Sequence, residues 1–150
     1  MIKVLMVCLG NICRSPLAEG ILQSKINPNY IFVDSAGTAA YHVGNLPDTR
    51  SIEVARNYGI NIANQRARKF VVADFDVFDY IYAMDESNYQ NILSLARNKT
   101  DENKVQMILN ESHPNKSLPV PDPYYGGKQG FENVYKMLDE ACEIIANKLS

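Results

Sequence analysis

The residue types best suited to chemistry gather in one short segment, residues 8–15, with the sequence CLGNICRS. Five residues separate Cys8 from Arg14, so a loop between them can wrap round one phosphate while both side chains face it. The guanidinium of Arg14 is a planar fork that matches two phosphate oxygens. A thiolate beneath a bound phosphate is placed for in-line attack on phosphorus, which would form a phosphocysteine. The segment therefore predicts phosphoryl transfer, with Cys8 as nucleophile and Arg14 as phosphate clamp.

The same segment is expected to form an oxyanion-binding loop, because it joins an apolar run to a helix start. Backbone N–H groups in such a loop point into one concavity, and the helix N-terminus adds donors and partial positive charge. This setting favours the ionised form of Cys8, to which the hydroxyl of Ser15 can donate a hydrogen bond. Gly10 gives the chain room to turn, and Asn11 tolerates unusual backbone angles. The predicted phosphate-binding residues are Leu9, Gly10, Asn11, Ile12, Cys13 and Ser15.

Alternating strands and helices are expected to position this loop. Apolar runs predict strands at residues 2–7, 31–33, 79–84 and 105–109. Helical spacing predicts helices at residues 16–26 with Ser15 as N-cap, at 47–58, after Asp85 as far as Leu95, and at about 131–149. A polar, proline-rich loop is expected over residues 110–130. The alternation predicts a doubly wound α/β fold, in which ligands bind beyond the carboxyl ends of the strands.

Composition limits what else the chain could be. Its 150 residues suit one domain spanning 1–150, and the formal net charge of -2 provides no global field for nucleic acid. No apolar run approaches the roughly 18 residues that a membrane span needs, so membrane insertion is not expected. The apolar residues 1–7 resemble a strand more than a signal peptide.

The chain has three cysteines, Cys8, Cys13 and Cys142. An odd count without a signal peptide favours a reducing compartment, so a cytoplasmic location is expected. Their spacing fits no common zinc pattern, so no metal site is expected. Because Cys13 lies in the same loop as Cys8, their sulfurs can approach disulfide distance, and Cys13 is predicted to be the redox partner of an oxidised Cys8.

Over nearly its whole length the chain resembles the low-molecular-weight protein tyrosine phosphatases. The resemblance is carried by residues 7–16 (VCLGNICRSP), 34–38 (DSAGT), 78–81 (FDYI), 84–88 (MDESN) and 122–126 (DPYYG). It implies a four-stranded parallel sheet with helices on both faces, and no cofactor. It also implies hydrolysis of phosphotyrosine in proteins or peptides, and of small aryl phosphates, with inorganic phosphate as a product.

The resemblance also implies an acid and a substrate pocket. Expelling a tyrosine oxygen needs a proton, which a positioned carboxylic acid can supply. Asp122 would donate that proton and then act as base for the water that cleaves the phosphocysteine. Tyr124 and Tyr125 would form an aromatic wall, and Tyr41 would face them across the pocket.

Further residues are assigned supporting roles by the same resemblance. Asn11 and Ser35 would brace the loop through hydrogen bonds, and Asp85 would orient Arg14. The chain departs from the family at Gln65, where relatives often carry histidine. Gln65 can still donate and accept hydrogen bonds, but a role that needs a charged imidazole would be lost.

Other interpretations stay open at this point. Taken singly, Cys8 could be a core residue, Arg14 a solvated charge, Asp122 a turn former, Tyr41 surface and Asp85 a helix cap. An arsenate reductase would use the same loop with two more cysteines on a mobile segment, for which Cys142 is badly placed. A phosphopeptide-binding module would keep the loop but lose the thiol or the acid, and both are present.

Overall fold

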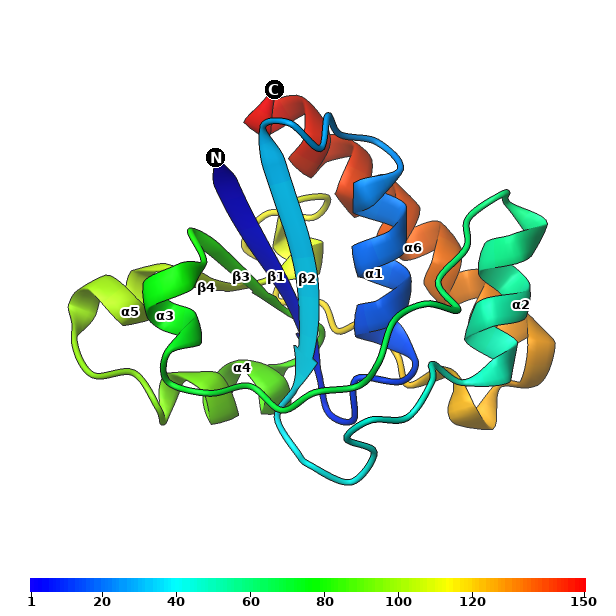
Figure 1. Ribbon diagram of the computed structural model, residues 1–150, viewed down its shortest axis with the longest axis horizontal. Helices are drawn as coiled ribbons and strands as arrows, with labels where there is room; N and C mark the ends of the chain where they lie inside the picture. The colour runs from blue at the N-terminus through cyan, green and yellow to red at the C-terminus, as the bar shows by residue number, and fades with distance from the viewer.

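A four-stranded parallel sheet forms the centre of the molecule (Figure 1). In this computed structural model, all residues from 1 to 150 are described, except for the side chain of Tyr125. The strands are β1 (Ile2–Cys8), β2 (Ile31–Gly37), β3 (Tyr80–Ala83) and β4 (Val105–Met107). They lie in the order β2-β1-β3-β4, and every pairing is parallel.

Helices cover both faces of the sheet. They are α1 (Arg14–Gln23), α2 (Thr49–Asn57), α3 (Asp74–Val77), α4 (Glu86–Leu93), α5 (Lys99–Asn103) and α6 (Gly127–Leu149). Short 3-10 turns occupy Ile108–Asn110 and Pro123–Tyr125. Figure 1 shows α1, α2 and α6 on one side of the sheet and α3, α4 and α5 on the other. The predicted fold class is therefore confirmed.

Strand β1 is buried on both faces, which explains its nearly unbroken apolar sequence. Val4, Met6 and Cys8 point into the core beneath α1 and α6. Leu5 and Val7 point into the second core, beneath α3 and α4. Because side chains alternate along a strand, the sulfur of Cys8 ends on the α1 side of the sheet. The strand thus delivers the thiol to the start of the helix that follows it.

Several predicted boundaries are wrong. Helix α1 begins at Arg14 with Cys13 as N-cap, so Ser15 lies inside the first turn and does not cap the helix. Helix α6 begins at Gly127, four residues before the predicted start, with φ of 58° at that glycine. Strand β2 continues to Gly37, because it pairs with β1 as far as Cys8. Strand β4 stops at Met107, where the chain tightens into a 3-10 turn.

Two short helices, α3 and α5, were not predicted. Their sequences are too short to show helical periodicity, and hydrogen bonds between side chains and nearby backbone N–H groups support them instead. In α5, the backbone N–H of Asp101 donates to the side chain of Asn98, which is the N-cap. Asp74 in α3 accepts from the backbone N–H of Val71. No helix among the described residues is long and apolar enough to cross a membrane.

Candidate active site

A cavity of about 260 Å³ opens at the carboxyl edge of the sheet, where the loops after β1 and β2 meet the segment before α6. This is the edge at which parallel sheets bind ligands. The two chain termini lie toward the other end of β1 and β2 (Figure 1). The cavity is lined by Cys8, Leu9, Gly10, Ile12, Cys13, Arg14, Tyr41, His42, Asp48, Asp122 and Tyr124. The structure therefore brings the predicted nucleophile, clamp and acid together.

The backbone of the loop turns its carbonyls away from the cavity. The carbonyls of Cys8, Leu9 and Ile12 accept hydrogen bonds from the backbone N–H groups of Thr38, Ala39 and Asp48, at 2.9, 2.9 and 2.7 Å. These bonds orient the peptide units so that their N–H sides are left to face a ligand. The arrangement suits an oxyanion, which accepts hydrogen bonds and donates none.

The sulfur of Cys8 lies at the closed end of this loop. Only 3% of Cys8 is exposed, and its Sγ lies 3.0 Å from the Oγ of Ser15. The predicted contact between these two residues is therefore present, although Ser15 is not a cap. Asn11 stands at the bend with φ of 56°, the left-handed conformation that asparagine tolerates.

Arg14 is held by two acceptors from different segments of the chain. Its Nη1 donates to Oδ2 of Asp85 at 2.8 Å and to the carbonyl of Val120 at 2.9 Å. Both hydrogens of Nη1 are thereby used, so ligand binding falls to Nε and Nη2, an edge that matches two phosphate oxygens. Asp85 also caps α4 by accepting from the backbone N–H of Asn88 at 2.8 Å. Asp85 therefore makes the predicted contact with Arg14 and is also a helix cap, as the alternative interpretation proposed.

Asp122 lies across the cavity on an exposed loop. Its carboxylate accepts from the backbone N–H of Tyr124 at 3.0 Å and so caps the 3-10 turn that follows. Two residues earlier, the backbone N–H of Val120 bonds to the carbonyl of Met84 at the end of β3, at 2.8 Å. That bond fixes the segment carrying Asp122 to the sheet. Asp122 therefore forms a turn, as the alternative interpretation proposed, and its side chain also lines the cavity.

Two aromatic side chains stand at the mouth of the cavity. Tyr41 is 77% exposed and Tyr124 is 59% exposed, although both line the cavity. Large rings with exposed faces at an opening are suited to stacking against a ligand ring. The predicted contribution of Tyr125 concerns a side chain outside the described residues.

Two residues that line the cavity, His42 and Asp48, were not predicted from the sequence. The ring of His42 packs so close to Gly10 that a Cβ there would lie 2.9 Å from its Cδ2, so a larger residue would have to displace the ring. Asp48 caps α2 and pairs with Arg50, and these bonds hold the pKa of its carboxyl below the ordinary value. An aspartate directly before a predicted helix was a usable signal for Asp48, whereas nothing local marks His42.

The second thiol of the loop, Cys13, has a different environment from that of the nucleophile. Burial is the main cause that raises its pKa to about 12, and the negative charges of Asp48 and Cys8 act in the same direction. Cys13 is therefore a neutral thiol at physiological pH. Its side chain lines the same cavity as Cys8.

Asn11 and Ser35 make the predicted bracing bonds. The Nδ2 of Asn11 donates to Oγ of Ser15 at 2.8 Å and to Oγ of Ser35 at 2.9 Å. Its Oδ1 accepts from the backbone N–H of Arg68 at 3.0 Å. Gln65 lies apart from these bonds and donates instead to the carbonyl of Pro16 at 3.1 Å.

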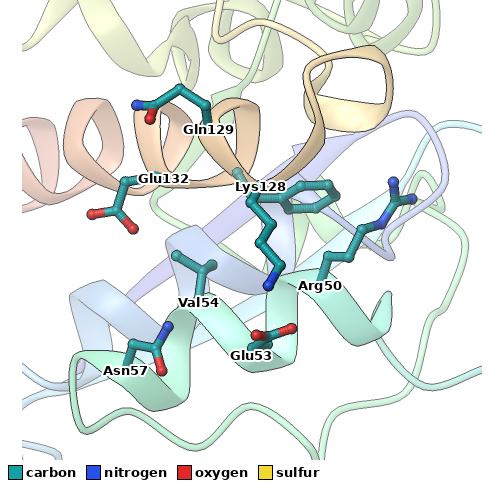
Figure 2. A pocket seen from close by; sticks show the side chains of 8 residues that line it. Arg50, Glu53, Val54, Asn57, Lys128, Gln129 and Glu132 are labelled. Atoms are coloured by element: carbon teal, nitrogen blue, oxygen red, sulfur yellow. The ribbon is translucent and has the colours of Figure 1, made fainter.

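A second cavity, of about 280 Å³, lies between α2 and the first turns of α6 (Figure 2). Its walls carry Arg50 and Glu53 from α2 and Lys128 and Glu132 from α6. The guanidinium of Arg50 lies 5.1 Å from the ring centre of Tyr124, so this residue joins the two cavities by a cation–π contact. The side chains lining the second cavity include no thiol, so the first is the candidate active site.

Comparisons with known proteins match nearly the whole chain. A family model for "Low molecular weight phosphotyrosine protein phosphatase" matches residues 3–150. The phosphatase of that description from Schizosaccharomyces pombe is 44% identical over 142 residues, covering 91% of this chain and 90% of that protein. The corresponding protein of Homo sapiens is 39% identical over 151 residues, covering 97% and 94%. A crystal structure of a protein tyrosine phosphatase from Entamoeba histolytica, with Hepes in its active site, matches with a TM-score of 0.90 and 39% identity, covering 99% and 97%.

The two roles of Asp85 can be separated by substitution. Asp85→Asn keeps an acceptor for the α4 cap but removes the charge that holds Arg14, so inorganic phosphate should bind roughly tenfold more weakly with little change in melting temperature. Asp85→Ala should lose the same affinity and about 1 kcal/mol of stability as well. Calorimetric titration and thermal unfolding measure the two effects. Wild-type phosphate affinity in Asp85→Asn would show that Arg14 needs no charged partner.

Proposed function

The chain belongs to the low molecular weight phosphotyrosine protein phosphatase family and is a protein tyrosine phosphatase, and we propose that Cys8, Arg14 and Asp122 carry out its reaction. One observation supports this proposal above the others. A buried thiol at the closed end of an N–H-lined loop shares a cavity with a fixed guanidinium and an exposed carboxyl group. These three groups suffice for the two steps of a covalent phosphatase mechanism.

In the first step, the thiolate of Cys8 attacks phosphorus. The S–P bond forms as the bond from phosphorus to the tyrosine oxygen breaks, and the carboxylic acid of Asp122 gives its proton to that oxygen. Arg14 and the backbone N–H groups bind the phosphate oxygens and oppose the negative charge that they carry. Tyrosine then leaves past the aromatic mouth of the cavity.

In the second step, water attacks the phosphorus of phosphocysteine. The carboxylate of Asp122 takes a proton from that water while the S–P bond breaks, which releases inorganic phosphate and restores the thiolate of Cys8. Ser15, whose Oγ lies 3.0 Å from the sulfur, donates a hydrogen bond to the leaving thiolate. This hydrogen bond makes sulfur a better leaving group and so assists both the start and the end of the cycle.

The proposed substrates are proteins or peptides that contain phosphotyrosine. The exposed rings of Tyr41 and Tyr124 at the mouth suit a phenyl ring between the phosphate and a polypeptide. Attack requires Cys8 as a reduced thiol, which supports a reducing compartment, and we propose the cytoplasm. An arsenate-reductase relay is disfavoured, because Cys142 is fully buried in α6, where its sulfur lies 3.7 Å from the carbonyl of Ala18.

The nucleophile is tested by Cys8→Ser. Serine has no neighbouring base to ionise it, so turnover of phosphotyrosine peptides should fall below detection while the fold stays intact by circular dichroism. Rapid-quench kinetics with an aryl phosphate should show a burst of phenol in the wild type and none in the variant. Cys142→Ala is the matched control and should retain the burst. Substantial turnover by Cys8→Ser would exclude the proposed mechanism.

The acid is tested by comparing leaving groups. Asp122→Ala should lower kcat by roughly 10²–10⁴ for phosphotyrosine, whose leaving oxygen must be protonated. For p-nitrophenyl phosphate the loss should be much smaller, because nitrophenolate leaves without a proton. Steady-state kinetics on both substrates measure the ratio. An equal loss on both would mean that Asp122 is not the acid.

The redox role of Cys13 is tested with peroxide. Peroxide oxidises the thiolate of Cys8 to a sulfenic acid, and attack by Cys13 then releases water and leaves a Cys8–Cys13 disulfide. Oxidation also removes the negative charge of Cys8, one of the causes that keep Cys13 protonated. Cys13→Ser should be inactivated as fast as the wild type but recover far less activity with dithiothreitol. Equal recovery, or the absence of the disulfide from mass spectra of the oxidised wild type, would refute this role.

A further inference from the structure

Glu19 is a largely buried carboxyl group beneath the phosphate-binding loop, and the proposed reaction does not use it. It lies on α1, five residues after Arg14, and its Oε1 accepts from the hydroxyl of Ser35 at 2.6 Å. Burial is the main cause that raises its pKa to about 7; the bond from Ser35 opposes this rise. Its position and its near-neutral ionisation suggest a link to the nucleophile.

The charged groups that face Glu19 come from two other elements. Asp34 on β2 raises the pKa of Glu19, and Arg68 in the segment before α3 lowers it. Arg68 is shared, because it also pairs with Asp34 at 3.2 Å and with Asp74 at 3.1 Å. Arg66 lines the same polar cavity as Glu19. The positive charge nearest Glu19 is thus divided among three carboxylates.

A chain of hydrogen bonds connects Glu19 with Cys8, and its directions follow from the amide of Asn11. The Oδ1 of Asn11 accepts a backbone N–H, that of Arg68, so the amide cannot be flipped and its Nδ2 must donate. The two hydrogens of Nδ2 go to the hydroxyl oxygens of Ser15 and Ser35. Each serine then has one hydrogen to give. Ser35 gives its hydrogen to Glu19, and Ser15 gives its hydrogen to Cys8 whenever that sulfur is the thiolate, which can only accept.

We propose that Glu19 is a positioning residue for the nucleophile, because its carboxylate anchors Ser35, which holds Asn11 and, through Asn11, the hydroxyl of Ser15 beside the sulfur of Cys8. The inference rests on the proposed function of Cys8. While Glu19 is ionised, Ser35 can give its hydrogen away and still accept from Asn11. Once Glu19 carries a proton, it can donate to Ser35 and so compete with Asn11 for the lone pairs of that hydroxyl. The bond that anchors Asn11 to Ser35 weakens, and Asn11 then holds Ser15 less firmly beside the sulfur.

Gln65 offers a way to change the ionisation of Glu19 from outside the chain of hydrogen bonds. Gln65 lines the same cavity as Glu19, but its amide supplies no charge, and its Oε1 is buried without a hydrogen-bond partner among the described residues. A cation at this position would stabilise the Glu19 carboxylate and move its ionisation to lower pH. Gln65→His is therefore the variant that should shift the pH response without touching the chain of hydrogen bonds.

The kinetic experiment follows kcat for a phosphotyrosine peptide between about pH 5 and pH 9. The wild type should show an inflection near pH 7 that is absent in Glu19→Gln, which keeps an acceptor but does not titrate. Gln65→His should move this inflection to lower pH. Glu19→Leu, which has no acceptor, should lose roughly tenfold in kcat at every pH with little change in KM. Glu140→Gln, an exposed carboxyl change on α6, is the control and should match the wild type.

A second measurement does not depend on turnover. The rate at which iodoacetamide alkylates Cys8, assigned by mass spectrometry, should step by roughly threefold near pH 7 in the wild type and not in Glu19→Gln. Ser35→Ala removes the relay but leaves Glu19, and should also abolish the step, which covers the case in which Glu19→Leu fails to fold. A wild-type step in either Glu19→Gln or Ser35→Ala would overturn the inference. Turnover by Cys8→Ser would instead refute the proposed function.

Discussion

Arg14 uses one guanidinium nitrogen to hold Asp85 and the carbonyl of Val120, and the geometry of the site depends on this pair of bonds. Asp85 caps α4 two residues after the end of β3, while Val120 belongs to the loop that carries the acid. An arginine whose side chain moved freely would lose conformational entropy each time it bound a phosphate. Arg14 is only 6% exposed and is already oriented in the folded protein. Most of that entropy is therefore lost during folding and not during phosphate binding.

The site concentrates charges of both signs in a chain whose net charge is only -2. An arginine or backbone donor accompanies each of its carboxylates: Asp85 holds Arg14, Asp48 holds Arg50, and Asp122 accepts from the backbone of Tyr124. This pairing keeps the acids from repelling an incoming phosphate as bare charges would. The remaining donors of Arg14 and the N–H groups of the loop then make the local electrostatic potential positive. The site can therefore attract an anion without help from an extended basic surface.

Features of the site that depend on neighbouring residues could be predicted from the sequence, whereas features that depend on long-range contacts could not. The residues from Cys8 to Ser15 are contiguous, and their order alone specifies a strand, a turn and a helix start. Asp85 follows β3 and Ser35 lies near the carboxyl end of β2, so parallel topology brings them to the same edge. His42 could not be found in this way, because the path of its loop depends on bonds from Gly44 to Ala67 and from Asp48 to Ile12, which no local pattern encodes. The predicted Ser15 cap failed for a related reason, since its hydroxyl is engaged by Asn11 and Cys8.

Asn11 is where the demands of the backbone and of the site coincide. A left-handed residue other than glycine costs roughly 1–2 kcal/mol. Glycine would avoid that cost, yet it would leave Ser15, Ser35 and the N–H of Arg68 without their shared partner. Three buried or partly buried hydrogen bonds, each worth roughly 0.5–1.5 kcal/mol, offset the strain. The amide also fixes the direction of every hydrogen between Glu19 and Cys8, which glycine cannot do. The loop therefore requires a side chain that tolerates positive φ and both donates and accepts, and among the common residues asparagine meets all three conditions.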